Sequence, residues 1–328
     1  MTDGPFERLA GLVANDLVAV NGLIHERMAS EHAPRIPEIS AHLIDAGGKR
    51  LRPILTLAAA QLCGYQGGDH IKLAATVEFI HTATLLHDDV VDESGKRRGR
   101  TTANILWDNK SSVLVGDYLF ARAFLLMVEC GSLKVLEILS TASAVIAEGE
   151  VLQLSTAHDL TTDQDRYEQV IYGKTAALFE AAAEVGGEIS DVSPEQVQAL
   201  ATYGRGLGMA FQLSDDFLDY GGDSAALGKN TGDDFREGKV TMPVILALAR
   251  GDQAAKDFWI RTVGTGNVAD GDLEQAMAYL ADTNALADTQ ARARACADEA
   301  IQALDVFPES PMRTALRDIA EFVVTRKS

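Results

Sequence analysis

The sequence predicts an all-α protein that folds as one large helical bundle over residues 1–328. Long segments carry apolar residues at spacings of three and four, as in 134–154 (KVLEILSTASAVIAEGEVLQL) and 165–185 (DRYEQVIYGKTAALFEAAAEV). This is the period of a helix with a buried face. No proline occurs between Pro53 and Pro194, and this interval is rich in Ala, Leu and Glu, which favour helices. Alternating strand patterns flanked by turns are not evident.

The expected helices are separated by recognisable breaks. Gly47–Gly48, the polar loop 93–103 and the glycine-rich stretch 221–241 interrupt the helical pattern. Ser193 followed by Pro194 marks a helix start, because serine caps free N–H groups and proline fits the first helical position. Neither a linker nor a fixed-period repeat divides the chain, so we expect one domain of about ten or more helices.

Charge, cysteine spacing and hydropathy argue against a nucleic-acid-binding, a disulfide-rich or a membrane-spanning protein. The net charge is −19 and the pI is near 4.7, which argues against nucleic acid as a partner. Cys63, Cys130 and Cys296 are far apart and lack metal-ligand spacing, which suits unpaired thiols in a reducing compartment. The N-terminus has no signal pattern, and no uninterrupted apolar run reaches the length of about 18 residues of a membrane span. We therefore expect a cytoplasmic protein without a transmembrane segment.

Two copies of the pattern D-D-x-x-D occur where helical segments end. They are Asp88, Asp89 and Asp92, and Asp215, Asp216 and Asp219. Like charges one turn apart are destabilising, and acids at a helix C-terminus oppose its dipole. Mg²⁺ relieves both costs, since it is typically held by one or two carboxylates together with substrate phosphates. The sequence predicts a central cavity flanked by two aspartate-rich helix ends that grip one polyphosphate group from both sides.

Basic residues lie beside these clusters and beside the breaks, in an otherwise acidic chain. They are Lys49, Arg50 and Arg52 in GGKRLRP, Arg97 and Arg98 after the first cluster, Lys174 in GKT, and Lys229 and Lys239 after the second cluster. Arginine forks and lysine point charges are the groups that recognise phosphate. A solvated surface is the alternative for any one of them, but their common placement favours phosphate binding.

Three further motifs do not indicate a different chemistry. The GKT of 173–175 is not a P-loop, because Glu168 stands where that loop needs a glycine. The glycines of GRGLG, at 204–208, follow no strand, so we expect close helix packing there. Glu78-x-x-His81 occurs once, whereas a di-iron bundle needs two such motifs.

Together these motifs resemble those of trans-prenyl diphosphate synthases, in that family's order. They are GGKRLRP, LLHDDVVDE followed by RRG, GKT, FQLSDDFLDY and GKNTGDDFREGK, and the similarity reaches the C-terminal DIAEFVVTRK. The resemblance implies the all-α isoprenoid synthase fold, usually as a homodimer. It also implies head-to-tail condensation of isopentenyl diphosphate with an allylic diphosphate such as farnesyl diphosphate, by ionisation, condensation and elimination.

The resemblance also implies a role for each motif residue. The six aspartates would hold Mg²⁺, three ions per site, against the allylic diphosphate. The same diphosphate would be contacted by Arg97, Lys174, Lys229 and Lys239. The diphosphate of isopentenyl diphosphate would be bound by Lys49, Arg52, His81 and Arg98. Thr175 and Gln212 would lie near the developing carbocation, and Arg326 would close over the second substrate.

Product length is expected to depend on the helix that precedes the first cluster. Ala83 and Thr84 are small, whereas short-chain members of the family commonly place bulky aromatics there as a floor. We expect an open tunnel and a long product, with Phe124 and Met127 as candidate floor residues; simple packing of a helix interface is the alternative. EFIHTATLLHDDVVDE also resembles the octaprenyl, solanesyl and decaprenyl synthases that make quinone side chains.

Other interpretations remain open from the sequence. A geranylgeranyl diphosphate synthase would share all the motifs, and a non-catalytic subunit of a heteromeric synthase would be expected to lose aspartates. A terpene cyclase would share an aspartate motif and Mg²⁺, but it would not need GGKRLRP. A purely structural bundle leaves the clustered charges unexplained. Peripheral membrane contact is also open, since the product is greasy.

Overall fold

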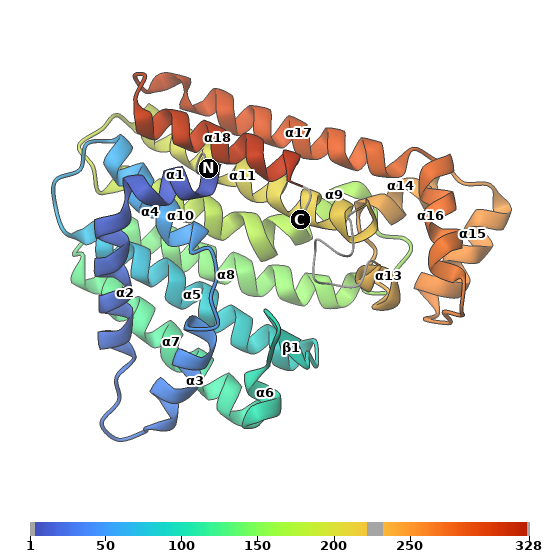
Figure 1. Cartoon of the computed structure of the whole chain (residues 1–328), viewed down its shortest axis with the longest axis horizontal. Coiled ribbons are helices and arrows are strands. Elements are labelled where there is room, and N and C mark those ends of the chain that lie inside the picture. The colour runs from blue at the N-terminus through green and yellow to red at the C-terminus, as the bar shows by residue number, and fades with distance from the viewer. Residues whose placement is uncertain (1–3, 222–231, 327–328) are drawn as a thin grey trace. The chain divides into compact units, whose positions relative to one another are not determined.

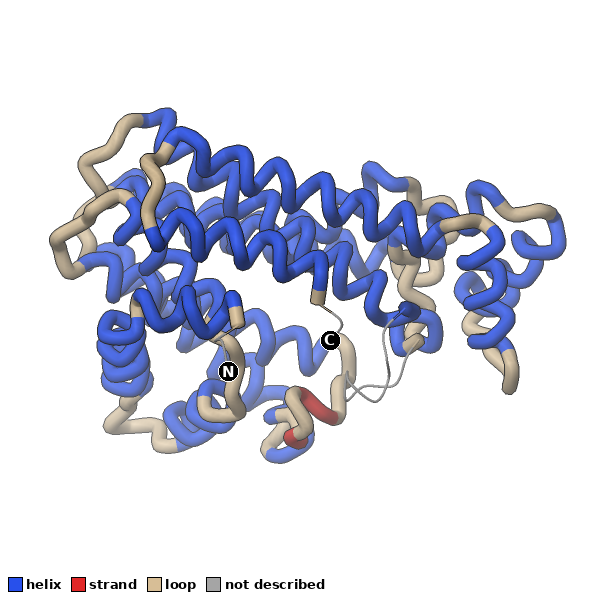
Figure 2. Tube along the Cα trace, turned by 45° about the horizontal axis from the view of Figure 1, so that its top comes forward, coloured by secondary structure: helices blue, strands red, loops and turns tan. Residues whose placement is uncertain are grey.

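In the computed structural model, helices make up most of the described chain, which comprises residues 4–221 and 232–326 (Figure 2). Within these residues the exception is one pair of two-residue strands. The prediction of an all-α protein is therefore confirmed. Figure 1 labels the helices in chain order.

The chain divides into two compact units by its internal contacts. The first comprises Met1–Ser143, Ala181–Ala201 and Val306–Leu316, and the second comprises Ala144–Glu180, Thr202–Asp305 and Arg317–Ser328. Four helices contribute residues to both units: α8 (Leu133–Thr156), α10 (Ala177–Glu188), α11 (Pro194–Gly221) and α18 (Pro311–Thr325). The expectation of a single domain with a central cavity stays a prediction.

The first unit is built around α5 (Asp69–Val91). This helix packs against α2 (Ala14–Met28), α4 (Leu51–Leu62) and α7 (Asn109–Glu129). Every residue from 73 to 80 is buried, as expected for a helix with neighbours on all sides. The remaining helices of this unit are α1 (Pro5–Leu12), α3 (Arg35–Ile44) and α6 (Ala103–Leu106). The first aspartate cluster therefore lies at the C-terminal end of a firmly packed helix.

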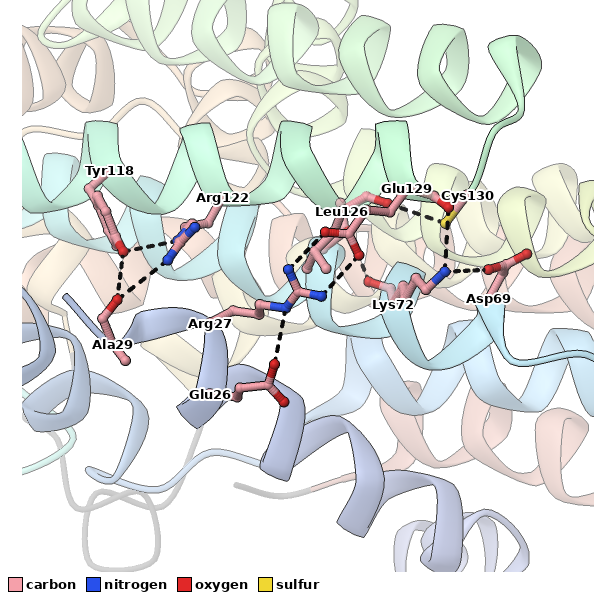
Figure 3. A network of polar contacts seen from close by, with 11 residues as sticks. Glu26, Arg27, Ala29, Asp69, Lys72, Tyr118, Arg122, Leu126, Glu129 and Cys130 are labelled. Carbon is pink, nitrogen blue, oxygen red and sulfur yellow. Dashed lines mark hydrogen bonds and ion pairs between the residues drawn. The ribbon is translucent and has the colours of Figure 1, made fainter. Parts of the chain in front are cut away.

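A seam of polar contacts holds α7 to α2 (Figure 3). Arg27 donates two hydrogen bonds to the Glu129 carboxylate, at 2.7 and 3.0 Å, and Tyr118 donates one to the Ala29 carbonyl at 3.1 Å. By length and composition alone α7 could cross a membrane, and 39% of the relevant stretch is buried. A core helix passes the same test, so this property does not place α7 in a membrane.

The expected break at 93–103 contains a small hairpin. β1 (Lys96–Arg97) pairs antiparallel with β2 (Arg100–Thr101). Arg98 and Gly99, between the strands, have φ of 52° and 76°. Positive φ at both central residues matches the type I′ turn of a two-residue hairpin. Strands this short carry no alternating pattern, which is why the sequence indicates only a loop here.

The second unit carries the second aspartate cluster on α11. Besides the shared helices, its elements are α9 (Gln164–Ile171), the π-helix η1 (Tyr172–Ala176), α13 (Asp233–Arg236), α14 (Met242–Arg250), α15 (Gln253–Trp259), the π-helix η2 (Ile260–Gly264), α16 (Asp272–Asp282), α17 (Ala285–Ala303) and the first two residues of the 3₁₀ turn η3 (Leu304–Val306). In GRGLG, a Cβ on Gly208 would come within 2.6 Å of Ala176 Cα, and one on Gly206 within 2.7 Å of the Cys296 carbonyl oxygen. The prediction of close helix packing at this motif is confirmed.

The ion pair of Arg261 and Asp272 should make the stability of the protein depend on pH. Two hydrogen bonds of 2.8 Å from Arg261 and one of 2.7 Å from the Ala269 N–H lower the pKa of Asp272 to about 2. A carboxyl group whose pKa is lowered by folding contributes stability that is present above about pH 4 and is lost as the pH falls toward 2. In Asp272→Asn this part of the pH dependence should be missing from urea unfolding curves recorded between pH 2 and pH 5. An unchanged slope in the variant would contradict the assignment.

Candidate active site

Basic side chains of the first unit gather around His81 on α5. Arg52 Nη1, at the start of α4, lies 3.3 Å from His81 Nε2. Burial, followed by the charges of Arg52, Arg98, Arg97 and Arg50, holds the pKa of His81 well below its usual value. The imidazole is therefore neutral, and its Nε2 accepts a hydrogen bond from Arg52. The structure thus brings the predicted residues Arg52, His81 and Arg98 into one basic cluster.

The hairpin places Arg98 against the Gly47–Gly48 break. Its guanidinium donates a hydrogen bond to the Gly47 carbonyl, and a Cβ added to Gly48 would meet Arg98 Nη1 at 2.6 Å. Gly48 also has a φ of 148°, so a glycine is required here both for its backbone and for the approach of the arginine. Lys49 follows directly and is exposed. Lys49 and Arg98 therefore lie on neighbouring segments.

The three aspartates of the first cluster differ in their surroundings. Asp89 is fully buried and accepts a hydrogen bond of 2.7 Å from Arg97 Nε, while its Oδ2 is buried with no hydrogen-bond partner among the described residues. Burial raises the pKa of Asp89, and the charge of Arg97 opposes this shift. Asp88 is half-buried and Asp92, the C-cap of α5, is exposed. Asp88 and Asp92 are therefore the pair that a ligand can reach, one turn apart.

The second cluster, on α11, shows a similar division. The Asp215 side chain is 44% exposed and accepts a hydrogen bond of 2.5 Å from Arg326 Nη2. Asp216 is buried, and its two oxygens accept hydrogen bonds from the Tyr167 hydroxyl and, at 2.9 Å, from the Gln212 amide. Burial, followed by the charge of Asp234, raises the pKa of Asp216. Asp215 is therefore the more accessible of these two carboxylates.

Asp219, the third residue of this cluster, holds the short helix α13. Its carboxylate accepts the backbone N–H groups of Asp233 and Asp234, at 3.2 and 3.1 Å. Burial and the charge of Asp234 raise the pKa of Asp219 to about 6. Lys239 Nζ, just beyond this helix, lies 2.6 Å from Glu237 and 3.5 Å from Asp234. Asp219 thus fixes the segment that carries Lys239.

The π-helix η1 presents the GKT residues. Thr175 donates a hydrogen bond of 2.8 Å to Gln212 Oε1, which orients the amide so that its nitrogen donates to Asp216. Lys174 is half-buried and pairs with Glu150 at 3.1 Å. Wide turns of this kind are frequent at functional sites. The predicted residues Thr175, Gln212 and Asp216 therefore form one hydrogen-bonded chain, whereas Lys229 lies outside the described residues.

The four residues expected to set product length lie in the first unit. Ala83 and Met127 are both fully buried, at 0% exposure, and Thr84 is half-buried. The Thr84 hydroxyl donates to the His81 carbonyl at 2.8 Å. Phe124 is 40% exposed. Of the pair Ala83 and Thr84, Thr84 is therefore the residue that borders accessible space. The role of all four residues in setting product length stays a prediction.

The carboxylates fit a metal that is shared with a phosphate ligand. Within residues 4–221 and 232–326, no three His, Cys, Asp or Glu side chains converge in a way that would hold an ion by themselves. Asp88 and Asp92 offer hard oxygen donors at a helix end whose dipole disfavours them. Mg²⁺ commonly takes one or two carboxylates and completes its shell with waters and substrate phosphates. The donor set therefore suits Mg²⁺ bound together with a diphosphate.

Sequence reasoning missed two residues of the second unit that contact predicted site residues. Tyr167 donates to Asp216, and Glu150 pairs with Lys174, across 49 and 24 positions of the chain. Each lies in a regular amphipathic segment, where a tyrosine or a glutamate carries no signal of its own. Only the packing of α8, α9 and α11 in three dimensions reveals them.

Replacing Tyr167 with Phe should lower kcat/KM by about 10- to 100-fold. The change keeps the ring but leaves one oxygen of buried Asp216 without its donor, and a buried acceptor left without a partner costs roughly 1–3 kcal/mol. Steady-state kinetics at several Mg²⁺ concentrations check this. Tyr118→Phe removes a tyrosine hydroxyl from the α2–α7 seam (Figure 3) and serves as the control, with kinetics close to wild type. Equal effects of the two changes would argue against a role for Tyr167.

Comparison with known proteins identifies the family. Residues 33–280 match the family model described as polyprenyl synthetase. The octaprenyl diphosphate synthase of Escherichia coli (strain K12) is 46% identical over 320 residues, which is 98% of each chain.

Two solved structures are similar along the whole chain. The decaprenyl diphosphate synthase from Rhodobacter capsulatus has a TM-score of 0.95 and 62% identity, covering 98% of this chain and 99% of that one. A polyprenyl synthase from Caulobacter crescentus CB15, complexed with calcium and isoprenyl diphosphate, has a TM-score of 0.93 and 51% identity, covering 100% of both chains. The predicted fold and the predicted prenyltransferase class are confirmed: this chain belongs to the polyprenyl synthetase family.

Proposed function

We propose that the protein adds isopentenyl diphosphate units to an allylic diphosphate such as farnesyl diphosphate and makes a long polyprenyl diphosphate, the precursor of a quinone side chain. One observation carries this proposal: α5 carries one residue of the basic cluster and one residue of the first aspartate cluster. His81, in the basic cluster, and Asp88, in the first aspartate cluster, are seven residues apart. They therefore lie on the same face of the helix, about 10 Å apart along its axis. This spacing suits two diphosphate substrates bound next to each other.

The two positions differ in their chemistry. The basic cluster of Lys49, Arg52, His81 and Arg98 binds the diphosphate of isopentenyl diphosphate directly, because it supplies several hydrogen-bond donors without a metal. Asp88, Asp92 and Asp215 would hold Mg²⁺, three ions per site, against the allylic diphosphate. The calcium and isoprenyl diphosphate in the related Caulobacter crescentus structure support this assignment.

The remaining motif residues act around the allylic diphosphate. Arg97, Lys174, Lys229 and Lys239 offset its charge, while Asp89, Asp216 and Asp219 hold Arg97, Gln212 and the α13 segment in place. Because Arg326 is paired with Asp215, its closure over the second substrate would require that contact to open.

The chemistry follows from these roles. Bound Mg²⁺ would stabilise the charge that develops on the leaving diphosphate. Lys174 and Arg97 act in the same direction as the allylic C–O bond breaks and both electrons leave with the diphosphate. The double bond of isopentenyl diphosphate then attacks the allylic carbon, and the adduct loses a proton to the departed diphosphate. Thr175 and Gln212, hydrogen-bonded to each other at 2.8 Å, would offer oxygen lone pairs to the developing cation.

The test is incubation of the purified protein with Mg²⁺, farnesyl diphosphate and labelled isopentenyl diphosphate, followed by reversed-phase chromatography of the dephosphorylated products. One long product of about eight to ten isoprene units is expected. Products that stop at geranylgeranyl length would support a short-chain synthase instead. No incorporation by folded protein would point to a partner subunit, and cyclic products to a terpene cyclase.

We also propose that the protein is a homodimer that uses the outer face of α7. Leu114, Leu125 and Val128 are 67%, 51% and 64% exposed. They lie at spacings of three and eleven residues on one side of the helix. Such a face is costly in water, and a second copy of the chain would cover it. The three cysteines are unpaired thiols, two partly buried and one buried, which supports a cytoplasmic location.

Replacing Leu125 with Asp should convert the dimer to a monomer, measured by size-exclusion chromatography with light scattering. A charge on the covered face would cost several kcal/mol in each copy. Lys134→Ala, which changes an exposed residue of α8, is the control and should remain dimeric. A monomeric wild type that binds anionic vesicles would instead favour peripheral membrane contact through this face.

A further inference from the structure

We infer that Glu78 is a positioning residue for the isopentenyl diphosphate site and that it acts through Arg50. The inference rests on the proposed function, which assigns an anion to the basic cluster around His81. Glu78 lies on α5 one turn before His81. Glu78 and His81 form the sequence pattern Glu-x-x-His, but this pattern occurs once and does not make a di-iron site. The buried carboxylate of Glu78 must therefore have another role.

Arg50 joins three helices of the first unit. Its backbone has φ 49° and ψ 32°, a left-handed conformation that is unusual for an arginine, at the residue before α4. Nη2 donates to the carbonyl of Ile44, the last residue of α3, at 2.7 Å, and Nη1 donates to Oε1 of Glu78 on α5. The two side chains are 15% and 4% exposed. Arg50 is therefore committed to contacts inside the protein, whereas Lys49 beside it is exposed.

Two parallel contacts fix the GGKRLRP segment on α5. Arg50 pairs with Glu78, and Arg52 lies 3.3 Å from His81. The two partners on α5 are one helical turn apart, and the two arginines are two residues apart. A single contact would let the GGKRLRP segment rotate about that contact, and the second contact prevents this rotation. The two contacts together therefore set the direction in which Arg52 and Lys49 point.

Glu78 also offsets the charge of the arginines. Burial raises the pKa of Glu78, and the charge of Arg50 and its hydrogen bond oppose this shift most strongly, followed by the charges of Arg52 and Arg98. An amide in place of the carboxylate would keep the shape and leave buried Arg50 without a counter-charge. The guanidinium would then move out, and the start of α4 would lose its fixed position. Binding of a diphosphate would have to restore that order, which weakens affinity.

The test is the pair of variants Glu78→Gln and Arg50→Met. Each should raise KM for isopentenyl diphosphate about tenfold, while KM for farnesyl diphosphate stays within about twofold of wild type. Isothermal titration with inorganic pyrophosphate in EDTA should show the same loss of affinity, without turnover or metal. The double variant should be no worse than either single one, since both changes break one interaction. It also leaves no unpaired buried charge, so it should fold even where a single variant does not.

Asp272→Asn is the matched control, because it breaks another Arg–carboxylate pair, in the second unit. It should lower the thermal midpoint and leave both KM values unchanged. Unchanged pyrophosphate affinity in folded Glu78→Gln would overturn the inference. The inference would also be overturned if the variants lost kcat only in proportion to their loss of thermal stability. If Arg50→Met weakens pyrophosphate binding and Glu78→Gln does not, Arg50 is itself a phosphate ligand and the inference is wrong. A wild type that binds pyrophosphate without elongating contradicts the proposed function, while the titrations still test Glu78.

Discussion

Replacing Asp88 with Asn is expected to lower kcat by about a thousandfold with little effect on folding. Asp88 is half-buried at the end of α5 and shares its accessible face with Asp92, one turn away. The amide keeps the size of the side chain and removes the negative charge that we propose holds Mg²⁺ against the diphosphate. Electrostatic groups aimed at a leaving group each contribute about 10²–10³ in rate, and a metal contributes more.

Single-turnover assays over a range of Mg²⁺ concentrations measure this effect. Asp69→Asn provides the control, since it changes the same residue type at the opposite end of the same helix, where Asp69 pairs with Lys72 at 2.9 Å. Asp69→Asn should retain activity close to wild type. A loss below about tenfold in Asp88→Asn, with Mg²⁺ dependence unchanged, would remove Asp88 from the metal site.

Replacing Thr84 with Phe is expected to shorten the product by several isoprene units. An isoprene unit is about as long as one helical turn, roughly 5 Å, so a product of eight to ten units needs a path along most of a helix. Thr84 is one turn before Asp88 and is half-buried, so an aromatic ring has accessible space to enter. A ring there would act as a floor close to the reacting carbon.

Ala83→Phe is the companion variant. Ala83 is fully buried, so its ring must displace neighbours and should cost about 1–3 kcal/mol of stability in addition to shortening the product. Chromatography of the products, together with thermal midpoints, separates the two effects. An unchanged product length in both variants would refute a tunnel beside this part of α5. Val77→Leu, in the same buried helix and two turns earlier, controls for overpacking alone.

Much of the site could be predicted because its signals are local. The period of apolar residues predicts the helices, and two D-D-x-x-D patterns at helix ends predict metal binding through charges that a bare helix end would not tolerate. GGKRLRP and RRG stand out as basic segments in an acidic chain. These patterns depend on residues within about one turn of each other, so they can be recognised in the sequence without the tertiary structure.

Only the tertiary structure distinguishes the aspartates within one cluster from each other. The sequence gives no distinction among the aspartates of one cluster, but burial and partners separate Asp88 from Asp89, which is enclosed and held by Arg97. Asp219 binds backbone N–H groups of α13, which begins fourteen residues later. The exposed fraction and the charge around a carboxylate depend on which helices pack beside it, and no local pattern encodes that.

By itself, then, the sequence determined an all-α chain with two acidic helix ends and a basic segment of the kind that recognises phosphate. Packing decided which of these charges stay accessible and which are buried and hold other side chains in place. Glu78 and Arg50 show the difference most clearly: they are 28 positions apart, and no local pattern in the sequence pairs them. Their pairing depends on how α4 lies against α5, because a buried charge is stable only where folding brings its counter-charge within contact.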